Sequence, residues 1–260
     1  MDILKHNRSA WDKQSADGES PWVKPVDANT IQAARNGHWT VILTPLIAVP
    51  NTWFANVKNK EILCLASGGG QQVPVLAAAG AKVTSFDNSA VQLEKDRLVA
   101  NREGLSIATV QGDMADLSCF ADAQFDLIFH PVSNVFCEDI RPVWHECARV
   151  LRPGGRLLSG FMNPCFFLFD HDAIEQDGVP VVRFALPYSD TEDFPKDRLA
   201  QRIAANEAME FSHSLDTQIG EQLRAGFMLA DFYEDHWDDA ASPLNRFMPT
   251  SMATLAIRVD

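Results

Sequence analysis

The sequence is poor in positive charge and in cysteine. Its 22 Lys and Arg residues stand against 35 Asp and Glu, so the net charge is −13, and basic residues form no cluster. Nucleic-acid binding relies on cationic contacts with phosphate, which disfavours a DNA or RNA substrate. The five cysteines are odd in number and lack C-x-x-C spacing. That pattern argues against a zinc site and a disulfide framework, so we expect no bound metal and a reducing, cytoplasmic location.

Long apolar runs are also missing. A membrane-spanning helix needs roughly 18 or more apolar residues, whereas the longest candidate, residues 41–50, is interrupted by Pro45. The first residues show no apolar core followed by a small-residue cleavage site, so we expect neither membrane insertion nor secretion. With 46% hydrophobic and 22% charged residues, the 260-residue chain has the composition of a globular protein with a full core.

The chain divides into stretches of different pattern. Residues 1–58 contain Trp, Pro and short helical patterns, and we interpret them as a helical cap. Residues 59–260 are expected to form an α/β domain, with an irregular, aromatic-rich insertion at about 164–212. The insertion is followed by one more helical pattern and two apolar segments, 226–237 and 250–259, which are expected to pair antiparallel at the edge of a sheet.

Short apolar strands alternate with amphipathic helices between residues 60 and 163. The expected strands are residues 61–65, 82–86, 107–110, 125–129 and 156–161, and the expected helices are residues 73–79, 89–103 and 139–151. Such alternation requires βαβ crossovers and predicts a doubly wound, mainly parallel sheet of about seven strands. In an open sheet of this kind, ligands bind beyond the carboxyl ends of the strands.

Three loops at those strand ends carry candidate binding residues. The first, Ala66-Ser67-Gly68-Gly69-Gly70, is glycine-rich, so its backbone can turn sharply and approach a ligand closely. Asp87 ends the second strand, where a carboxylate can accept hydrogen bonds from both hydroxyls of a ribose. Asp113 and Met114 follow the third strand and could hold an adenine through its amine and its ring face. Each feature also has a plain structural explanation, as a turn or a helix cap.

Together these loops resemble the class I S-adenosylmethionine-dependent methyltransferases. Residues 62–70 match the first motif of that family, residues 86–89 the ribose motif, and residues 112–114 the adenine motif; residues 125–128 and 150–155 match the later strand and turn. The resemblance implies S-adenosyl-L-methionine as cofactor, S-adenosyl-L-homocysteine as product, and a small molecule as methyl acceptor. The implied cofactor contacts are Ala66, Ser67, Gly68, Gly70, Gln71, Asp87, Asn88, Gln92, Asp113, Met114 and His130.

The first motif departs from the family pattern at two positions. Cys64 stands where an acidic residue is usual, and Ala66 where a glycine is usual. The lost carboxylate often anchors the loop, so the methionine end of the cofactor could be held differently. We hypothesise that Gln71 and Gln72 compensate.

Catalytic residues are poorly marked, because a sulfonium methyl is already activated and needs mainly an aligned acceptor. His130 and Asn134, after the fourth strand, are candidates for a base or for orienting groups, while a buried structural histidine is an equal alternative for His130. The loop lacks the Asn/Asp-Pro-Pro-aromatic pattern of enzymes that methylate exocyclic amines or amides. Trp11, Trp39 and Tyr188 could line an apolar acceptor pocket, although such aromatics more often pack a cap onto a sheet.

Two other functions stay open at this point. A non-catalytic protein that binds S-adenosylmethionine would show the same loops. A nicotinamide-dependent oxidoreductase shares the fold and the ribose aspartate, but its fingerprint needs glycines where Ala66 and Gln71 stand. The sequence does not indicate an oligomeric state.

Overall fold

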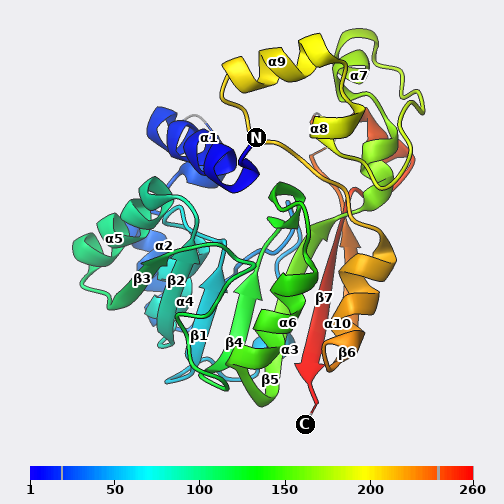
Figure 1. The fold of residues 1–260 in the computed structure, drawn as a ribbon. Helices are drawn as coiled ribbons and strands as arrows, with labels where there is room; N and C mark the ends of the chain where they lie inside the picture. Colours follow the sequence, from blue (N-terminus) through cyan, green and yellow to red (C-terminus); the bar gives the residue numbers. More distant parts are fainter. Residues whose placement is uncertain (19, 239–240, 260) are drawn as a thin grey trace.

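The fold is built on one seven-stranded sheet, shown in Figure 1. The computed structural model describes residues 1–18, 20–238 and 241–259. The strand order is β3-β2-β1-β4-β5-β7-β6; β1 to β5 pair in parallel, and β7 pairs antiparallel with both β5 and β6. The strands are β1 (Glu61–Leu65), β2 (Lys82–Asp87), β3 (Ile107–Gln111), β4 (Phe125–His130), β5 (Leu151–Met162), β6 (Phe227–Asp235) and β7 (Ser251–Arg258).

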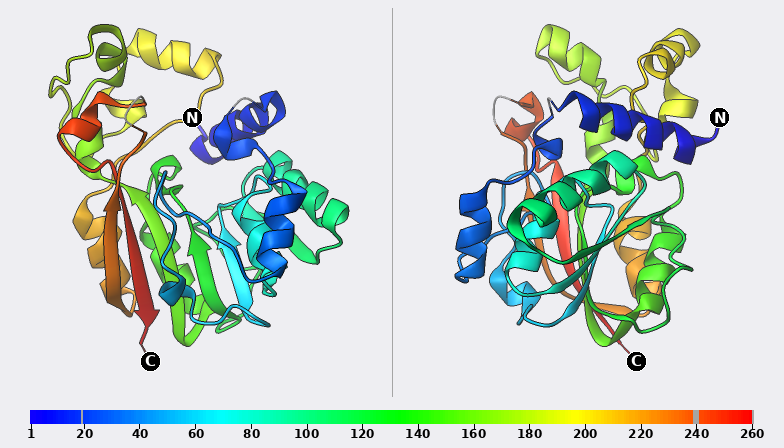
Figure 2. Two further views of the ribbon diagram at one scale, coloured as in Figure 1. Left: turned by 180° about the vertical axis from the view of Figure 1, so that it is seen from behind. Right: turned by 90° about the vertical axis from the view of Figure 1, so that its left-hand side faces the viewer.

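Helices lie on both faces of the sheet and above its upper end (Figures 1 and 2). The α-helices are α1 (Ile3–Asp17), α2 (Ala28–Arg35), α3 (Asn51–Phe54), α4 (Gln72–Ala78), α5 (Ala90–Glu103), α6 (Arg141–Val150), α7 (His171–Asp177), α8 (Asp190–Asp193), α9 (Lys196–Ala204) and α10 (Glu221–Arg224). The other helical turns are η1 (Pro21–Val23), η2 (Asn134–Phe136), η3 (Pro164–Leu168), the π-helical η4 (Asp216–Gly220) and η5 (Pro243–Arg246).

The doubly wound fold follows from the burial of both sheet faces. In β1, Ile62 and Cys64 belong to the core beneath α2, α3 and α4, whereas Leu63 and Leu65 belong to the core beneath α6. Successive side chains of a strand point to opposite faces, so a strand covered on both sides is apolar throughout. This explains why the strands read as continuous apolar runs in the sequence.

The predicted α/β sheet and its antiparallel C-terminal edge are confirmed. One boundary prediction was wrong: β5 begins at Leu151, directly after α6, and not at Arg156. The Pro153-Gly154-Gly155 segment forms an irregularity inside that strand, where the pairing with β4 shifts register. Gly154 has a φ of +74°, which a glycine adopts without a steric penalty, so the strand bends there without ending.

The N-terminal stretch has two parts with different positions. Its α1 and the turn η1 lie over the carboxyl ends of the parallel strands, where the insertion also stands (Figure 2). Residues 41–57 instead bury Leu43, Trp53 and Phe54 in the core on one sheet face. The division of the chain at residue 58 stays a prediction. Among the described residues, no helix is long and apolar enough to cross a membrane.

Candidate active site

A cavity of about 1960 Å³ lies beyond the carboxyl ends of the parallel strands and reaches up to the insertion. It is lined by nine of the eleven predicted cofactor residues: Ala66, Ser67, Gly68, Gln71, Asp87, Asn88, Gln92, Asp113 and Met114. The other two, Gly70 and His130, are not among the described residues that line it. Three separate loops of the sequence thus meet around one space.

The glycine-rich loop runs close against α5. The Gly68 N–H donates to Oδ2 of Asp87 over 3.0 Å. A Cβ at Gly68 would lie 2.9 Å from Cβ of Gln92, so no larger residue fits there without a shift. Ala66 has a φ of +48°, a left-handed conformation that costs an L-residue about 1–2 kcal/mol. The tight turn therefore forms even though alanine replaces the usual glycine.

Asp87 joins the glycine-rich loop to the start of α5. Its Oδ1 accepts from the N–H of Ser89 over 2.9 Å, while Oδ2 accepts from Gly68. Ser89 is the helix cap, because its own Oγ accepts from the N–H of Gln92. Burial raises the pKa of Asp87 to about 6. Each carboxylate oxygen keeps further lone-pair capacity toward the cavity, as a ribose-binding residue requires.

The walls of this part of the cavity fit an adenosyl group. Gln92 lines the cavity, while its Oε1 is buried beside Gly69 and accepts no hydrogen bond from the described chain. On the far side, Asp113 accepts from the N–H of Ala115 over 2.9 Å and lines the cavity beside Met114. An amide side chain, a carboxylate and a thioether thus line the space in which the loops meet.

A residue that the sequence reasoning missed takes over the anchoring of the loop. Asp96 of α5 is fully buried; its Oδ1 accepts from the N–H of Gly70 over 2.8 Å and its Oδ2 from Oγ of Ser85 over 2.7 Å. Burial raises the pKa of Asp96 to about 7. Cys64, where the family usually has an acid, is also fully buried. A carboxylate of α5 therefore holds the loop at Gly70, although β1 carries no acid at position 64.

Gln71 and Gln72 hold the N-terminal stretch, which corrects the hypothesis that they replace the missing acid. Nε2 of Gln71 donates to the carbonyl oxygen of Lys24 over 3.0 Å. Oε1 of Gln72 accepts from the N–H of Ile42 over 3.1 Å. The carbonyl of Gly70 also accepts from the N–H of Val26 over 2.8 Å. Residues 21–26 are thereby tied to the glycine-rich loop.

Asn88 and its neighbour connect the cofactor loops to α1. Oδ1 of Asn88 accepts from Nε of Arg8 over 2.8 Å, and its Nδ2 donates to the carbonyl of Leu4 over 3.0 Å. Oγ of Ser89 donates to Oδ1 of Asp12 over 2.5 Å. One end of the site is therefore closed by α1.

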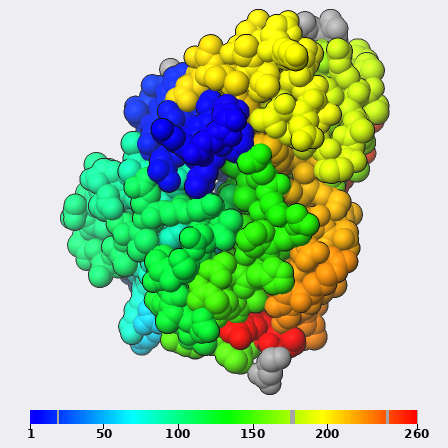
Figure 3. All heavy atoms as spheres, in the orientation of Figure 1, coloured from blue at the N-terminus to red at the C-terminus, as the bar shows by residue number. Residues whose placement is uncertain are grey.

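The opposite side of α1 is bound to the insertion. The side chain of Asn7, which is 2% exposed, donates to the carbonyls of Phe136 and Met209 over 2.9 and 3.0 Å. It also accepts from the N–H of Met209 over 2.8 Å. Lys13 donates to the carbonyl of Ala205 over 2.8 Å. In Figure 3, α1 and α9 accordingly meet above the sheet.

His130 and Asn134 lie beneath the cavity wall. Both side chains are fully buried; Nδ1 of His130 lies 3.0 Å from the carbonyl oxygen of Leu65, and Nε2 lies 2.7 Å from Oδ1 of Asn134. Burial lowers the pKa of His130, which favours the neutral ring. Asn134 continues the chain of hydrogen bonds to Gln218 over 2.9 Å. This geometry supports the structural alternative for His130, which ties the end of β4 to the end of β1.

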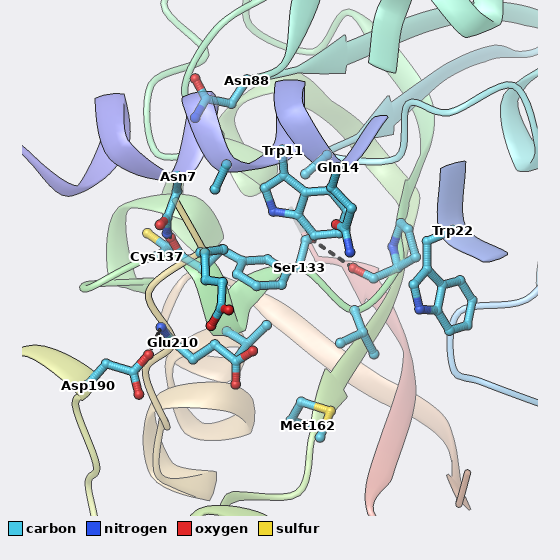
Figure 4. A pocket seen from close by; sticks show the side chains of 18 of the residues that line it. Asn7, Trp11, Gln14, Trp22, Asn88, Ser133, Cys137, Met162, Asp190 and Glu210 are labelled. Atoms are coloured by element: carbon cyan, nitrogen blue, oxygen red, sulfur yellow. Dashed lines mark hydrogen bonds between the residues drawn. The ribbon is translucent and has the colours of Figure 1, made fainter. Parts of the chain in front are cut away.

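The three predicted substrate residues occupy different places. Trp11 projects from α1 into the cavity, as Figure 4 shows, with its ring edge-on to Phe136 at 5.0 Å. Tyr188 lines the cavity from the insertion and is only 5% exposed. Trp39 instead packs edge-on against Phe54 at 5.0 Å, in the core on one face of the sheet, and is not among the described residues that line the cavity. Trp39 is therefore positioned for packing and not for substrate contact.

Comparison with known proteins assigns this fold and site to a class. A family model described as "Methyltransferase domain" matches residues 63–159, which run from β1 into β5. A curated relative that is 49% identical and 99% covered is also a methyltransferase. The chain belongs to the S-adenosylmethionine-dependent class I methyltransferases, as its motifs indicated.

That relative is the "uncharacterized methyltransferase YbaJ" of Bacillus subtilis (strain 168), aligned over 257 residues and 99% of both chains. A solved S-adenosylmethionine-dependent methyltransferase from Mesorhizobium loti has a TM-score of 0.60 at 17% identity, covering 80% of this chain and 94% of that one. The 1,6-didemethyltoxoflavin-N1-methyltransferase of Burkholderia thailandensis, solved with bound 1,6-didemethyltoxoflavin and S-adenosylhomocysteine, has a TM-score of 0.59 at 14% identity. The match covers 98% of this chain and 88% of that one. The two structures share the fold with this chain.

Proposed function

We propose that this enzyme transfers the methyl group of S-adenosylmethionine to a small organic molecule enclosed between the sheet and the insertion. The observation that carries the proposal is the single cavity of about 1960 Å³. Pockets for one small ligand usually measure roughly 300–1,000 Å³. The cavity can therefore accommodate an acceptor beside the cofactor.

The chain's own residues would supply binding and alignment. Asp87 would accept from the ribose hydroxyls, Gln92 from another donor of the cofactor, and Asp113 with Met114 would contact the adenine. When bound, the cofactor supplies a methyl group that is already activated by a positively charged sulfur. Holding an acceptor in line with such a group can lower the barrier by roughly 7–11 kcal/mol at best.

The position of α1 over the cavity favours a small acceptor over a polymer. Hydrogen bonds tie α1 to α5 on one side and to residues 205–209 on the other, so this helix spans the cavity. The net charge of −13 also opposes binding of nucleic acid. The five cysteines are all free thiols, which supports the prediction of a reducing, cytoplasmic environment.

Labelled S-adenosylmethionine tests this function. The enzyme is incubated with a cell extract, and the label is then separated into a small-molecule filtrate and a macromolecular precipitate. We expect enzyme-dependent label in the filtrate. Label confined to protein or nucleic acid would contradict the proposal, and binding of S-adenosylhomocysteine without any transfer would favour the non-catalytic alternative.

A further inference from the structure

Beyond the cofactor loops, the cavity extends into a compartment walled by the insertion. Its apolar part is a cluster of Met162, Phe167, Tyr188 and Phe194, together with Val135 from the loop after β4. The rings of Phe167 and Tyr188 stack at 5.5 Å, and Phe194 meets Tyr188 at 6.0 Å. This wall suits an aromatic or aliphatic body on the acceptor.

The polar part of the compartment is negatively charged. Arg202 lies 3.1 Å from Asp190, 3.5 Å from Glu210 and 4.0 Å from Glu207, so one guanidinium faces three carboxylates. Tyr188 also donates to Asp190 over 2.5 Å. Burial raises the pKa of Asp190, as expected for carboxylates that lack enough positive charge nearby.

The other basic residues that line the cavity do not balance this charge. Arg198 pairs with Asp170 over 3.0 Å and with Asp172 over 2.8 Å. Lys13 donates to a backbone carbonyl of the insertion. Against these three cations, nine Asp and Glu side chains line the cavity. An anionic acceptor would therefore be repelled, whereas a cationic one would be attracted.

Glu210 is the carboxylate of the insertion that lies next to the loop after β4, and that loop itself carries the cavity-lining Glu138 and Asp139. The backbone N–H of Glu210 donates to Oδ2 of Asp190 over 2.8 Å, and the next residue, Phe211, donates to the carbonyl of Val135 over 2.8 Å. The residue before it, Met209, is bound by Asn7. Figure 4 shows the Glu210 side chain pointing into the pocket below Trp11 and toward Met162. The backbone thus fixes this carboxylate at the wall shared by α1, the β4 loop and the insertion.

Building on the proposed function, we propose that this compartment binds an acceptor with a basic amine on an aromatic or aliphatic body, and that Glu210 holds the ammonium group. The aromatic cluster receives the body, and the excess of carboxylates neutralises the charge. Burial raises the pKa of Glu210 to about 7, so this carboxylate can also take up a proton near neutral pH.

One proton moves from the ammonium group of the acceptor to Glu210. The N–H bond of the ammonium breaks, its electron pair stays on nitrogen, and the proton goes to a carboxylate oxygen of Glu210. The nitrogen then has the lone pair that a methyl acceptor needs. A basic amine of this kind differs from a planar exocyclic amine or amide, whose nitrogen lone pair is delocalised, so the missing Asn/Asp-Pro-Pro-aromatic loop does not oppose it.

Calorimetric titration of the enzyme saturated with S-adenosylhomocysteine tests the proposal. The probes are 2-phenylethylamine, the matched anion 3-phenylpropionate and the matched neutral 2-phenylethanol. We expect the amine to bind more tightly than either control. Glu210→Gln should weaken amine binding about tenfold or more, as expected for a charge-assisted hydrogen bond inside a cavity.

Glu192→Gln is the control variant, because Glu192 is an exposed carboxylate of the insertion that is not among the described residues that line the cavity. It should change amine binding less than about twofold, since exposed charges at a distance are screened by salt. Three results would overturn the proposal. The first is an anion or alcohol that binds as tightly as the amine or more tightly, the second is an amine that does not bind, and the third is a Glu210→Gln variant that binds the amine as tightly as the wild type does. Failure of the wild-type enzyme to bind S-adenosylhomocysteine would instead contradict the proposed function.

Discussion

At the residue level, two carboxylates hold the glycine-rich loop from different elements. Asp87 reaches it from the end of β2, and Asp96 reaches it from the middle of α5. Both carboxylates accept backbone N–H groups, so the loop is positioned before any ligand arrives. Preorganisation of this kind removes part of the ordering cost from the binding step.

Asp96→Asn should lower the free energy of unfolding by about 1–3 kcal/mol, because an amide cannot accept from both Gly70 and Ser85. Urea denaturation without cofactor measures the free energy of unfolding of the variant and of the wild type. Glu94→Gln, an exposed position on the same helix, is the control and should stay within about 0.5 kcal/mol of the wild type. Equal stabilities of the two variants would contradict an anchoring role for Asp96.

The raised pKa of Asp87 predicts a pH dependence of cofactor binding. Ribose hydroxyls donate to the ionised carboxylate, so affinity for S-adenosylhomocysteine should be full above the pKa of about 6. It should fall as the pH falls through that value and the carboxylate takes up a proton. Calorimetry between pH 5 and 8 measures the affinity for S-adenosylhomocysteine. An Asp87→Asn variant with the same pH profile as the wild type would contradict the assignment of this pH dependence to Asp87.

At the level of elements, α1 acts as a strap across the cavity. It is tied to the start of α5 by Arg8 and Asp12, and to the insertion by Asn7 and Lys13. In the proposed function, cofactor and acceptor would lie beneath it. Access to the site therefore depends on how firmly this helix is held, since local opening is governed by local stability.

Asn7→Ala should loosen this strap, because it removes three hydrogen bonds. The main-chain N–H of Met209 and the carbonyls of Met209 and Phe136 would each lose a partner. We expect faster amide hydrogen exchange in residues 3–17 and a loss of about 1–3 kcal/mol in unfolding free energy. Lys5→Ala, at an exposed position of the same helix, should leave both nearly unchanged. Unaltered exchange in Asn7→Ala would rule out this role.

The elements themselves could be predicted from the sequence, because a strand buried on both faces leaves a continuous apolar run ended by glycine or aspartate. The ligand loops follow from the ends of those strands. Asp96, Asn7 and Glu210 could not be found in this way. A polar residue inside a helical pattern resembles a solvent-facing one, and Asn7 meets its partner Met209 across 202 residues of chain. Such contacts exist only in the assembled fold.

For the molecule as a whole, the cofactor loops and the insertion line one continuous cavity. Loops at the strand ends line one part of this space, and the insertion with α1 lines another; we propose that the first binds the cofactor and the second the acceptor. The fold is shared with methyltransferases at 14–17% identity. The wall above the sheet carries an aromatic cluster and an excess of carboxylates. Specificity therefore depends on the segments added around the common sheet.

The most direct test of this account is calorimetric titration of S-adenosylhomocysteine into the wild type and Asp87→Ala. The account predicts one site per chain in the wild type and an affinity lower by about 1–3 kcal/mol in the variant, through lost hydrogen bonds to a charged group. Circular dichroism checks that the variant is folded, and NADH serves as the control ligand. Unchanged affinity in a folded variant, or binding of NADH but not of S-adenosylhomocysteine, would contradict the account.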